Sequence, residues 1–262
     1  MASRKLGKFK LHTLEGGSQK LDGGAMFGVV PKPLWERRIP ADARNRIPLA
    51  MRCLLVEHPS GLVLIDTGSG SKETDKFHDI YGIENRGSAP GDTWLEDSLR
   101  SIGVEPSDVA LVINTHLHFD HAGGNTRRDA DGTVRASFPR ARYVVQGGEY
   151  AYATHTNERT GASYFEANFV PLHESGQMEL IDGAREIVAG IRAVPAPGHT
   201  PHHQGILIES GGDAAFYPAD LVPTAAHLPL PWIMGYDVEP LVTLESKRRL
   251  LAEAVEKDWL VV

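Results

Sequence analysis

The chain has a single cysteine, Cys53, among its 262 residues. An intramolecular disulfide is therefore excluded. Cys53 lies in the apolar run 51–56, which predicts a buried strand position for the thiol rather than a reactive surface site. A thiolate is consequently not expected among the ligands of any metal ion in this protein.

Long hydrophobic runs are also missing. No apolar run approaches the ~20 residues that a transmembrane helix needs. Residues 1–8 are basic, but they lack the apolar stretch of a signal peptide. We therefore expect a cytoplasmic protein that neither spans nor binds a membrane.

Clustered positive charge is scarce. The formal net charge is −7, from 27 Lys and Arg against 34 Asp and Glu. The longest basic run is Lys247-Arg248-Arg249, which lies on a predicted helix and is expected to form a solvated face. Because nucleic-acid binding requires a surface of Lys and Arg, nucleic acid is not an expected partner.

What remains describes a globular protein. The sequence is 41% hydrophobic and 23% charged, and 262 residues are enough to bury one large core. No repeat or linker divides the chain, so a single α/β domain over residues 1–262 is expected.

The most informative segment follows the apolar run 109–113. It reads H-x-H-x-D-H over residues 116–121. Imidazole and carboxylate groups are the ligands that divalent zinc takes when thiolates are absent. Side chains alternate along a strand, so His116 and His118 would leave its end on the same side. A polar surface turn is the alternative, but such clustered groups are costly to desolvate without partners.

This motif resembles that of the metallo-β-lactamase fold superfamily. Further elements match in the family's order: Asp66 after the apolar segment 62–65, His199 in Pro-Gly-His-Thr-Pro, and Asp220 in Tyr-Pro-Ala-Asp. The matches extend over most of the chain. The resemblance implies an α/β fold of the four-layer αβ/βα sandwich type.

The resemblance also implies a dinuclear metal centre with two divalent ions, zinc being the expected metal. Asp120 and His121 would belong to the second ion, Asp220 would bridge both, and the remaining three histidines would hold the first. A hydroxide between two such ions attacks a carbonyl or phosphoryl centre. Asp120 is the expected catalytic residue, because it can carry a proton to the leaving alkoxide. The implied metal ligands are His116, His118, Asp120, His121, His199 and Asp220.

One departure from the family pattern concerns the C-terminus. The family's last metal-ligand histidine normally follows the C-terminal strand. Residues 259–262 are expected to be that strand, after a helix at about 243–257, and no histidine follows them. The sequence therefore looks clipped just before its last ligand, and the second ion is expected to bind more weakly than in a longer chain.

Periodicity and turn residues predict the remaining elements. Ser60-Gly61 and Gly211-Gly212 indicate tight hairpin turns, and Thr93-x-x-Glu96 is a capping box that opens a helix to about residue 102. Strands are expected at 9–14, 51–57, 62–66, 110–114, 142–146, 178–181, 186–194, 205–208 and 214–217.

Three irregular segments, 22–35, 149–173 and 223–236, are expected to be loops around the site. Their apolar and aromatic side chains predict a pocket for a small-molecule substrate with an apolar portion, although any one of them could equally pin its loop to the core. The candidate pocket residues are Met26, Phe27, His227, Trp232 and Tyr236.

Segments 22–35, 120–124, 219–224 and 232–237 resemble the quorum-quenching (YtnP-like) branch, which opens the lactone ring of N-acyl homoserine lactones. That branch is also similar to organophosphate hydrolases of the methyl parathion type. A phosphotriesterase or arylesterase is therefore the alternative, as is a non-catalytic metal-binding domain if the last ligand is absent. The well-known lactonases place a tyrosine three residues after the bridging aspartate. Pro223 stands there, so His227 or Tyr236 could take its contact.

Other polar residues have supporting roles in this interpretation. Asp66 could orient a ligand histidine through the second ring nitrogen. His203 is expected to be a hydrogen-bonded structural residue, and His202 is expected to be exposed. The sequence leaves a homodimer open.

Overall fold

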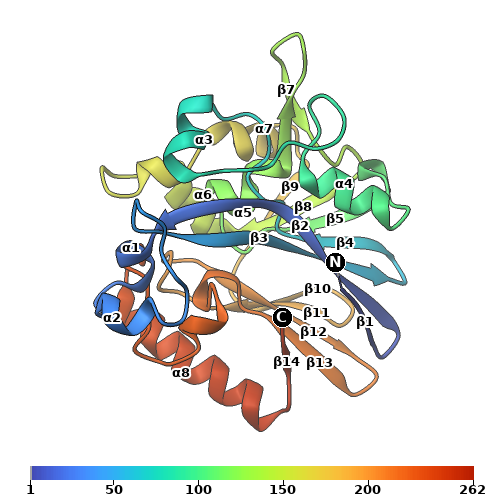
Figure 1. The fold of residues 1–262 in the computed structure, drawn as a ribbon. Helices are drawn as coiled ribbons and strands as arrows, with labels where there is room; N and C mark the ends of the chain where they lie inside the picture. Colours follow the sequence, from blue (N-terminus) through green and yellow to red (C-terminus); the bar gives the residue numbers. More distant parts are fainter. Residues whose placement is uncertain (1) are drawn as a thin grey trace. The chain divides into compact units, whose positions relative to one another are not determined.

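The computed structural model describes residues 2–262 and divides into two compact units. Unit 1 is formed by the chain up to Gln19 together with Ala50–Ile181. Unit 2 is formed by Lys20–Leu49 and Asp182–Val262. Each unit contains a sheet and its own helices, so the predicted α/β class is confirmed (Figure 1).

The seven-stranded sheet begins with two hairpins and continues with parallel strands. β1 pairs antiparallel with β2, and β3 with β4, whereas β4, β5, β8 and β9 are parallel. The alternating burial of β2 and β3 changes to nearly continuous burial in β5 and β8, as parallel central strands require. In sheet order the strands are β1 (Ser3–Leu6), β2 (Phe9–Asp22), β3 (Arg46–His58), β4 (Gly61–Ile65), β5 (Val109–Ile113), β8 (Arg142–Gln146) and β9 (Met178–Ile181).

Helices cover one face of this sheet (Figure 1). The core between them joins Leu95 and Leu99 of α4 to Leu64, Val112 and Tyr143 of the strands, all of them buried. Thr93 and Glu96 form the predicted capping box at the start of α4. The helices are α3 (Asp75–Tyr81), α4 (Trp94–Ser101), α5 (Phe119–Ala122), α6 (Gly147–Ala153) and α7 (Val170–Glu174), and a small hairpin, β6 (Thr126–Arg128) with β7 (Val134–Ala136), lies apart from the sheet.

Unit 2 is built on a five-stranded sheet and one long helix. α8 (Pro240–Glu256) lies along one face of this sheet (Figure 1), where Leu250 packs against Leu207, Phe216 and Leu221. The short helices α1 (Gly23–Phe27) and α2 (Lys32–Trp35) also belong to this unit. The strands in order are β10 (Arg185–Val188), β11 (Ile191–Pro195), β12 (Gln204–Ser210), β13 (Asp213–Tyr217) and β14 (Leu260–Val261).

The sequence predictions agree with many of these elements. The bounds of β8 and β9 are those predicted, and Gly211 and Gly212 form a hairpin turn with positive φ at both positions. The single strand expected at 186–194 was wrong: it is a hairpin, β10–β11, with Gly190 at φ 77° in its turn. The irregular segment at 22–35 contains α1 and α2, because Asp22 caps α1 and Pro33 lies in the first turn of α2.

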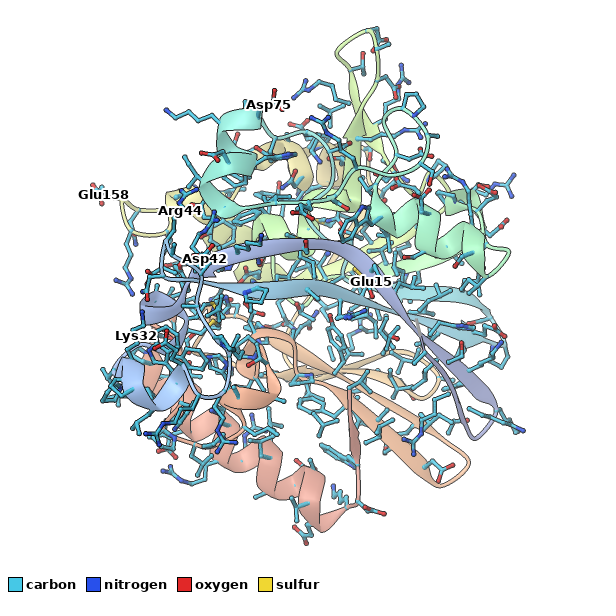
Figure 2. The ribbon with its side chains drawn as sticks, in the orientation of Figure 1. Glu15, Lys32, Asp42, Arg44, Asp75 and Glu158 are labelled. Carbon is cyan, nitrogen blue, oxygen red and sulfur yellow. The ribbon has the colours of Figure 1, made fainter. Side chains whose placement is uncertain are left out.

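Charged side chains lie on the surface of each unit. Asp75 and Glu158 of unit 1 and Lys32 of unit 2 are exposed (Figure 2). Exposed ion pairs contribute about 0–1 kcal/mol each, so the two buried cores account for most of the stability. Among residues 2–262, no helix combines the length and the apolar character that a membrane span needs.

Candidate metal centre

The candidate ligands of unit 1 follow parallel strands. Ile65 of β4 pairs with Ile113 of β5, and Ile113 pairs with Val144 of β8. The carboxyl ends of these strands therefore lie at one edge of the sheet, where open α/β sheets place their functional groups. Asp66 follows β4 and the H-x-H-x-D-H motif follows β5, so the topology brings them together.

The motif gathers its histidines closely. The ring centroids of His116 and His118 are 4.6 Å apart, and those of His116 and His121 are 4.2 Å apart. His116 is fully buried and His118 is 9% exposed. The chain turns into α5 directly after His118, and this turn brings Asp120 Oδ2 to 3.9 Å from His121 Nε2.

Asp66 fixes the tautomers of two of these histidines. It is 1% exposed and accepts hydrogen bonds from Thr115 N, Thr115 Oγ1 and His121 Nδ1, each at 2.8 Å. Since Thr115 gives its only hydroxyl proton to Asp66, His116 Nδ1 must be the donor in its 3.1 Å contact with Thr115 Oγ1. In the neutral rings, Nε2 of His116 and of His121 is therefore the nitrogen without a proton, the form that binds a metal.

The backbone of Asp66 has a φ of 57°, a left-handed conformation that is uncommon for a non-glycine residue. It is held by the three hydrogen bonds to its carboxylate and by its own N–H, which donates to Ile113 O at 3.0 Å. Such strain is typical of functional sites. The predicted contact between Asp66 and a ligand histidine is present.

The two glycines after the motif allow close backbone packing. A Cβ atom on Gly124 would lie 2.2 Å from Thr67 O, and one on Gly123 would lie 2.1 Å from Ser69 O. Thr67 N donates to His121 O at 2.8 Å across the same contact. Any larger side chain at these positions would push the motif at residues 116–121 away from the segment that follows Asp66.

Asp120 has a neighbour that sequence reasoning missed. Gln19 Nε2 donates to Asp120 Oδ2 at 2.6 Å, from 101 residues away in the chain. Phe119, next to Asp120 in the chain, packs edge-on against Phe77 at 4.9 Å and in a tilted arrangement against Tyr81 at 5.2 Å. Burial, with a smaller contribution from the Asp120 carboxylate, raises the pKa of Tyr81. The carboxylate thus has a donor on one side and apolar rings nearby.

Lys72, in the segment after Asp66, forms hydrogen bonds to the chain that follows the motif at residues 116–121. Its ammonium donates to the carbonyls of Gly123 and Thr126, the latter at 2.6 Å. Burial lowers the pKa of Lys72 to about 7. Between pH 7 and the unfolded value of 10.5, the folded chain has released this proton while the unfolded chain keeps it.

The free energy of unfolding of the metal-free protein should therefore gain a contribution that rises with pH above about 7. Denaturant titrations at pH 6.5 and pH 9.5, on wild type and Lys72→Met, measure it. The pH-dependent difference should be larger in wild type than in the variant. The same difference in both proteins would show that Lys72 keeps an ordinary pKa.

Unit 2 brings the remaining two candidate ligands together. His199 follows β11 and Asp220 follows β13, and His199 Nε2 lies 3.2 Å from Asp220 Oδ2. His199 Nδ1 donates to the Asp237 carboxylate at 2.9 Å, and Asp237 is 2% exposed. Nε2 of His199 therefore faces a carboxylate oxygen and is the ring nitrogen placed to bind a metal ion. Ala219, just before Asp220, has a φ of 45°, another left-handed residue beside the site.

The predicted pocket residues lie in an aromatic cluster of unit 2. Phe27 stacks on Trp35 at 5.2 Å and on His227 at 4.5 Å, and Trp232 meets Phe27 edge-on at 5.6 Å. Met26 belongs to the same cluster and is 2% exposed, whereas Tyr236 is 40% exposed. Most of these side chains are thus packed against one another, and their contact with a substrate stays a prediction.

Both ring nitrogens of His227 form hydrogen bonds within unit 2. Its Nε2 donates to Met26 O at 2.7 Å, and its Nδ1 accepts from Thr224 Oγ1 at 2.8 Å. Burial lowers its pKa, so the ring is neutral. Both ring nitrogens are thus hydrogen-bonded within the protein, and the predicted contact of His227 with a substrate stays a prediction.

Two other histidines behave as predicted. His203 is 1% exposed and donates from Nδ1 to Ala196 O at 3.1 Å, while His202 is exposed. The sequence analysis did not single out Asp237. Its partner His199 is 38 residues away, and no local spacing in the sequence signals such a pair.

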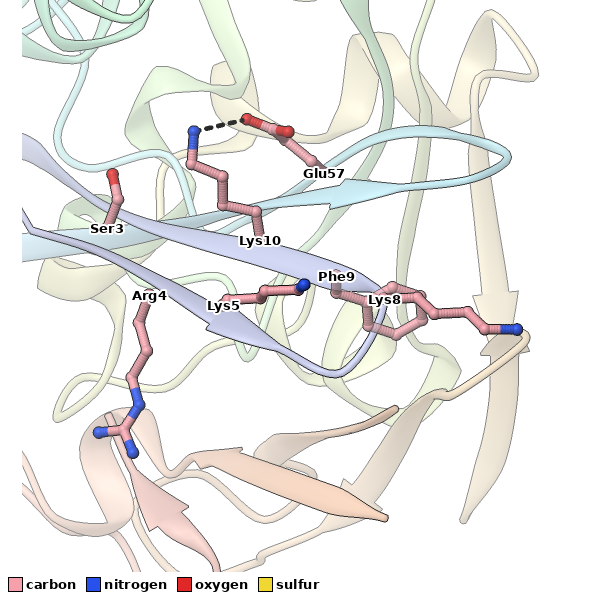
Figure 3. A pocket seen from close by; sticks show the side chains of 7 residues that line it. All are labelled: Ser3, Arg4, Lys5, Lys8, Phe9, Lys10 and Glu57. Carbon is pink, nitrogen blue, oxygen red and sulfur yellow. Dashed lines mark ion pairs between the residues drawn. The ribbon is translucent and has the colours of Figure 1, made fainter. Parts of the chain in front are cut away.

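A separate pocket lies at the hairpin of β1 and β2 in unit 1 (Figure 3). Lys10 Nζ approaches Glu57 Oε1 to 3.4 Å there, and Glu57 also accepts from His12 Nε2 at 2.7 Å. None of its lining residues is a candidate metal ligand. They are Ser3, Arg4, Lys5, Lys8, Phe9, Lys10 and Glu57.

The chemistry of the donor set fits divalent metal ions. Each unit presents imidazole nitrogens beside a carboxylate, and zinc binds these ligand types. In each case an aspartate holds the far side of the ring, as is usual for metal-binding histidines. The residues that could hold metal ions include His116, His118 and His121 of unit 1 and His199 and Asp220 of unit 2.

Comparison with known proteins finds one family model. It is described as the metallo-beta-lactamase superfamily and matches residues 48–257. An N-acyl homoserine lactonase from Bacillus thuringiensis is 31% identical over 221 residues, which are 82% of this chain and 80% of the relative. Another, from a Bacillus species, is 32% identical over 168 residues, 63% of this chain, and the match spans only 60% of that relative.

Solved structures give the same picture. A probable metal-dependent hydrolase from Staphylococcus aureus is 32% identical, with a TM-score of 0.90 over 99% of this chain and 90% of that one. A dizinc quorum-quenching lactonase, AidC, has a TM-score of 0.78 over 99% of this chain and 88% of that one. Its identity is 20%, so this second likeness concerns the fold alone.

Proposed function

Because the chain belongs to the metallo-beta-lactamase superfamily, we propose that it is a metal-dependent hydrolase that opens the lactone ring of N-acyl homoserine lactones. Membership of this family confirms the resemblance predicted from the motif at 116–121. The prediction of a metal-dependent hydrolase agrees with the names of the relatives. The lactone as substrate is taken from the curated relatives at about 30% identity.

We propose a dinuclear centre with the ligand set that the family resemblance implies. His116, His118 and His199 would hold one ion, while Asp120 and His121 would belong to the other and Asp220 would serve both. Divalent cations bound there would supply Lewis acidity and a hydroxide nucleophile, since they lower the pKa of bound water toward ~7.

The observation that carries this proposal is the hydrogen bonding behind the histidines. Asp66 holds the Nδ1–H of His121 directly and that of His116 through Thr115. Asp237 does the same for His199. All three rings thereby have Nδ1 as the hydrogen-bond donor, so that Nε2 is the nitrogen that can bind a metal in the neutral ring, an arrangement that an ordinary buried histidine cluster does not need.

The chain's own residues then account for the remaining chemistry. When the lactone carbonyl carbon gains an oxygen from water, the ring C–O bond breaks and the leaving alkoxide needs a proton. We propose that Asp120 takes this proton from the attacking water and delivers it to the alkoxide, with Gln19 holding its Oδ2 atom. The apolar rings of Tyr81, Phe119 and Phe77 beside Asp120 would suit an acyl chain and exclude water.

Metal content and substrate choice test the proposal together. The protein purified with excess zinc should contain two ions per chain. It should release acid from N-hexanoyl and N-decanoyl homoserine lactone faster than it releases nitrophenol from paraoxon. Rapid cleavage of paraoxon without any lactone opening would replace the lactonase by a phosphotriesterase. Metal content well below one ion per chain would refute the site.

A further inference from the structure

The long connection between Asp220 and Asp237 has little regular structure. Residues 221–236 contain one short 3-10 helix, Ala225–His227, beyond the turn that holds Asp220. Yet both ends of the connection belong to the proposed metal centre: Asp220 faces His199 Nε2, and Asp237 holds His199 Nδ1. The conformation of this segment therefore sets the spacing of the groups around His199.

Lys247 of α8 holds the middle of this segment. Its side chain is fully buried, and the three N–H groups of Nζ are shared among four carbonyl oxygens: His227 at 2.6 Å, Pro229 and Trp232 at 2.9 Å, and Leu230 at 3.4 Å. The expectation of a solvated face for the run 247–249 was therefore wrong for its first residue. A buried ammonium is costly unless polar groups replace its water, and four carbonyl dipoles do so here.

The carbonyls point inward because the other side of the segment is also fixed. His227 stacks on Phe27 with an interplanar angle of 3° and donates to Met26 O. Burial lowers the pKa of Lys247 to about 8, and the Asp237 carboxylate opposes that shift. The ammonium thus lies among carbonyl oxygens of the 227–232 segment. Without this lysine, these oxygens would face one another with no donor between them.

α8 holds the His199 loop with the neighbouring residues. Ser246 Oγ donates to Pro197 O at 2.7 Å. Gly198, at φ 134°, packs so tightly that a Cβ there would be 2.3 Å from Thr243 N. One turn of the helix therefore contacts both segments that carry the groups around His199.

We propose that Lys247 is a positioning residue that takes the place of a bound monovalent cation, and that its ammonium holds the 227–232 segment so that Asp220 and the His199–Asp237 pair keep their metal-binding arrangement. The part of this inference that concerns the metal rests on the proposed function. The carbonyl cage itself is a site for one ammonium-sized cation and does not depend on the reaction.

The first test compares two neighbours on the same helix. Lys247→Met keeps all but the last atom of the side chain's length and removes its charge, whereas Arg248→Met alters an exposed residue that pairs with Glu245. Zinc affinity, measured by competition with a chelator, should fall at least tenfold in Lys247→Met and stay at the wild-type value in Arg248→Met. Wild-type zinc affinity in a folded Lys247→Met protein would overturn the positioning role.

The second test separates a cation from mere packing. Lys247→Ala leaves a cavity beside the four carbonyls, and methylammonium chloride should restore its zinc affinity and raise its unfolding midpoint, while sodium chloride should not. Methylammonium should not help Lys247→Met, whose side chain fills the space. If no cation restores Lys247→Ala, the lysine acts through its stem alone and the cation role is refuted.

Two further readouts keep the outcomes distinct. If Lys247→Met does not fold, Lys247→Gln, an uncharged donor, should show an intermediate zinc affinity, and wild-type affinity there would exclude a need for charge. If the wild type binds zinc but opens no lactone, the proposed function fails and the affinity test stands. If it binds no zinc, the unfolding midpoints of the metal-free variants are compared with and without methylammonium. This comparison still decides whether the four carbonyls of the 227–232 segment require a cation.

Discussion

Replacement of Asp120 by asparagine should lower kcat for an N-acyl homoserine lactone by about 10²–10⁴-fold, the usual contribution of a positioned general acid. Asparagine keeps the size of the side chain and can still accept from Gln19, but it carries no transferable proton. The first ion should stay bound, because its proposed ligands are three histidines. Initial rates of acid release and metal content per chain, measured on the same preparation, give both quantities.

Gln19→Met is the matched control for this prediction. It removes the hydrogen bond at 2.6 Å but leaves the Asp120 carboxylate in place, so its loss should be well below that of Asp120→Asn. A near-wild-type rate for Asp120→Asn on whichever substrate is turned over would mean that another group carries the proton. Loss of both metals from Asp120→Asn would instead assign the residue a purely structural role in binding.

Local sequence signals predicted much of the fold. The bounds of β8 and β9 followed from short apolar runs, and the Gly211-Gly212 turn followed from the freedom of glycine at positive φ. The capping box at Thr93 is likewise a pattern of four adjacent residues. The hairpin at Gly190 was missed because the apolar pattern on its two sides reads as one continuous strand.

The motif residues were also local, but the contacts that support them were not. His116, His118, Asp120 and His121 lie within six positions, so their pattern is readable from the sequence alone. Gln19 reaches Asp120 across 101 residues. Such a pairing depends on which strands become neighbours, and nothing in a short window encodes that choice.

Lys247 is a second case in which contacts between residues distant in the sequence decide the environment of a side chain. A lysine followed by two arginines on a helix is typical of a solvated face, and Arg248 is indeed exposed. Lys247 is buried because carbonyls from 15–20 residues earlier in the chain surround its ammonium. Helical periodicity alone could not have predicted four backbone acceptors in place of water.

Asp66→Asn should weaken binding of the ion at His121 by about 10–100-fold, the usual cost of altering a group that orients a metal ligand. Asparagine tolerates the left-handed φ of 57° at this position, so the backbone should stay in place. The amide, however, offers one acceptor oxygen where the carboxylate accepts from Thr115 N, Thr115 Oγ1 and His121 Nδ1. An NH₂ group facing His121 favours the tautomer with the proton on Nε2, which cannot bind a metal.

Asp237→Asn is the equivalent substitution for His199, because Asp237 accepts the hydrogen bond from His199 Nδ1. His199 is proposed to bind the other ion. Stepwise zinc competition with a chelator should therefore show one weakened site in each single variant and two in the double variant. Added free energies in the double variant would indicate independent support of the two ions, as expected for separate hydrogen-bonded pairs. Tight binding of two zinc ions by a folded Asp66→Asn protein would show that its carboxylate does not set the tautomer of His121.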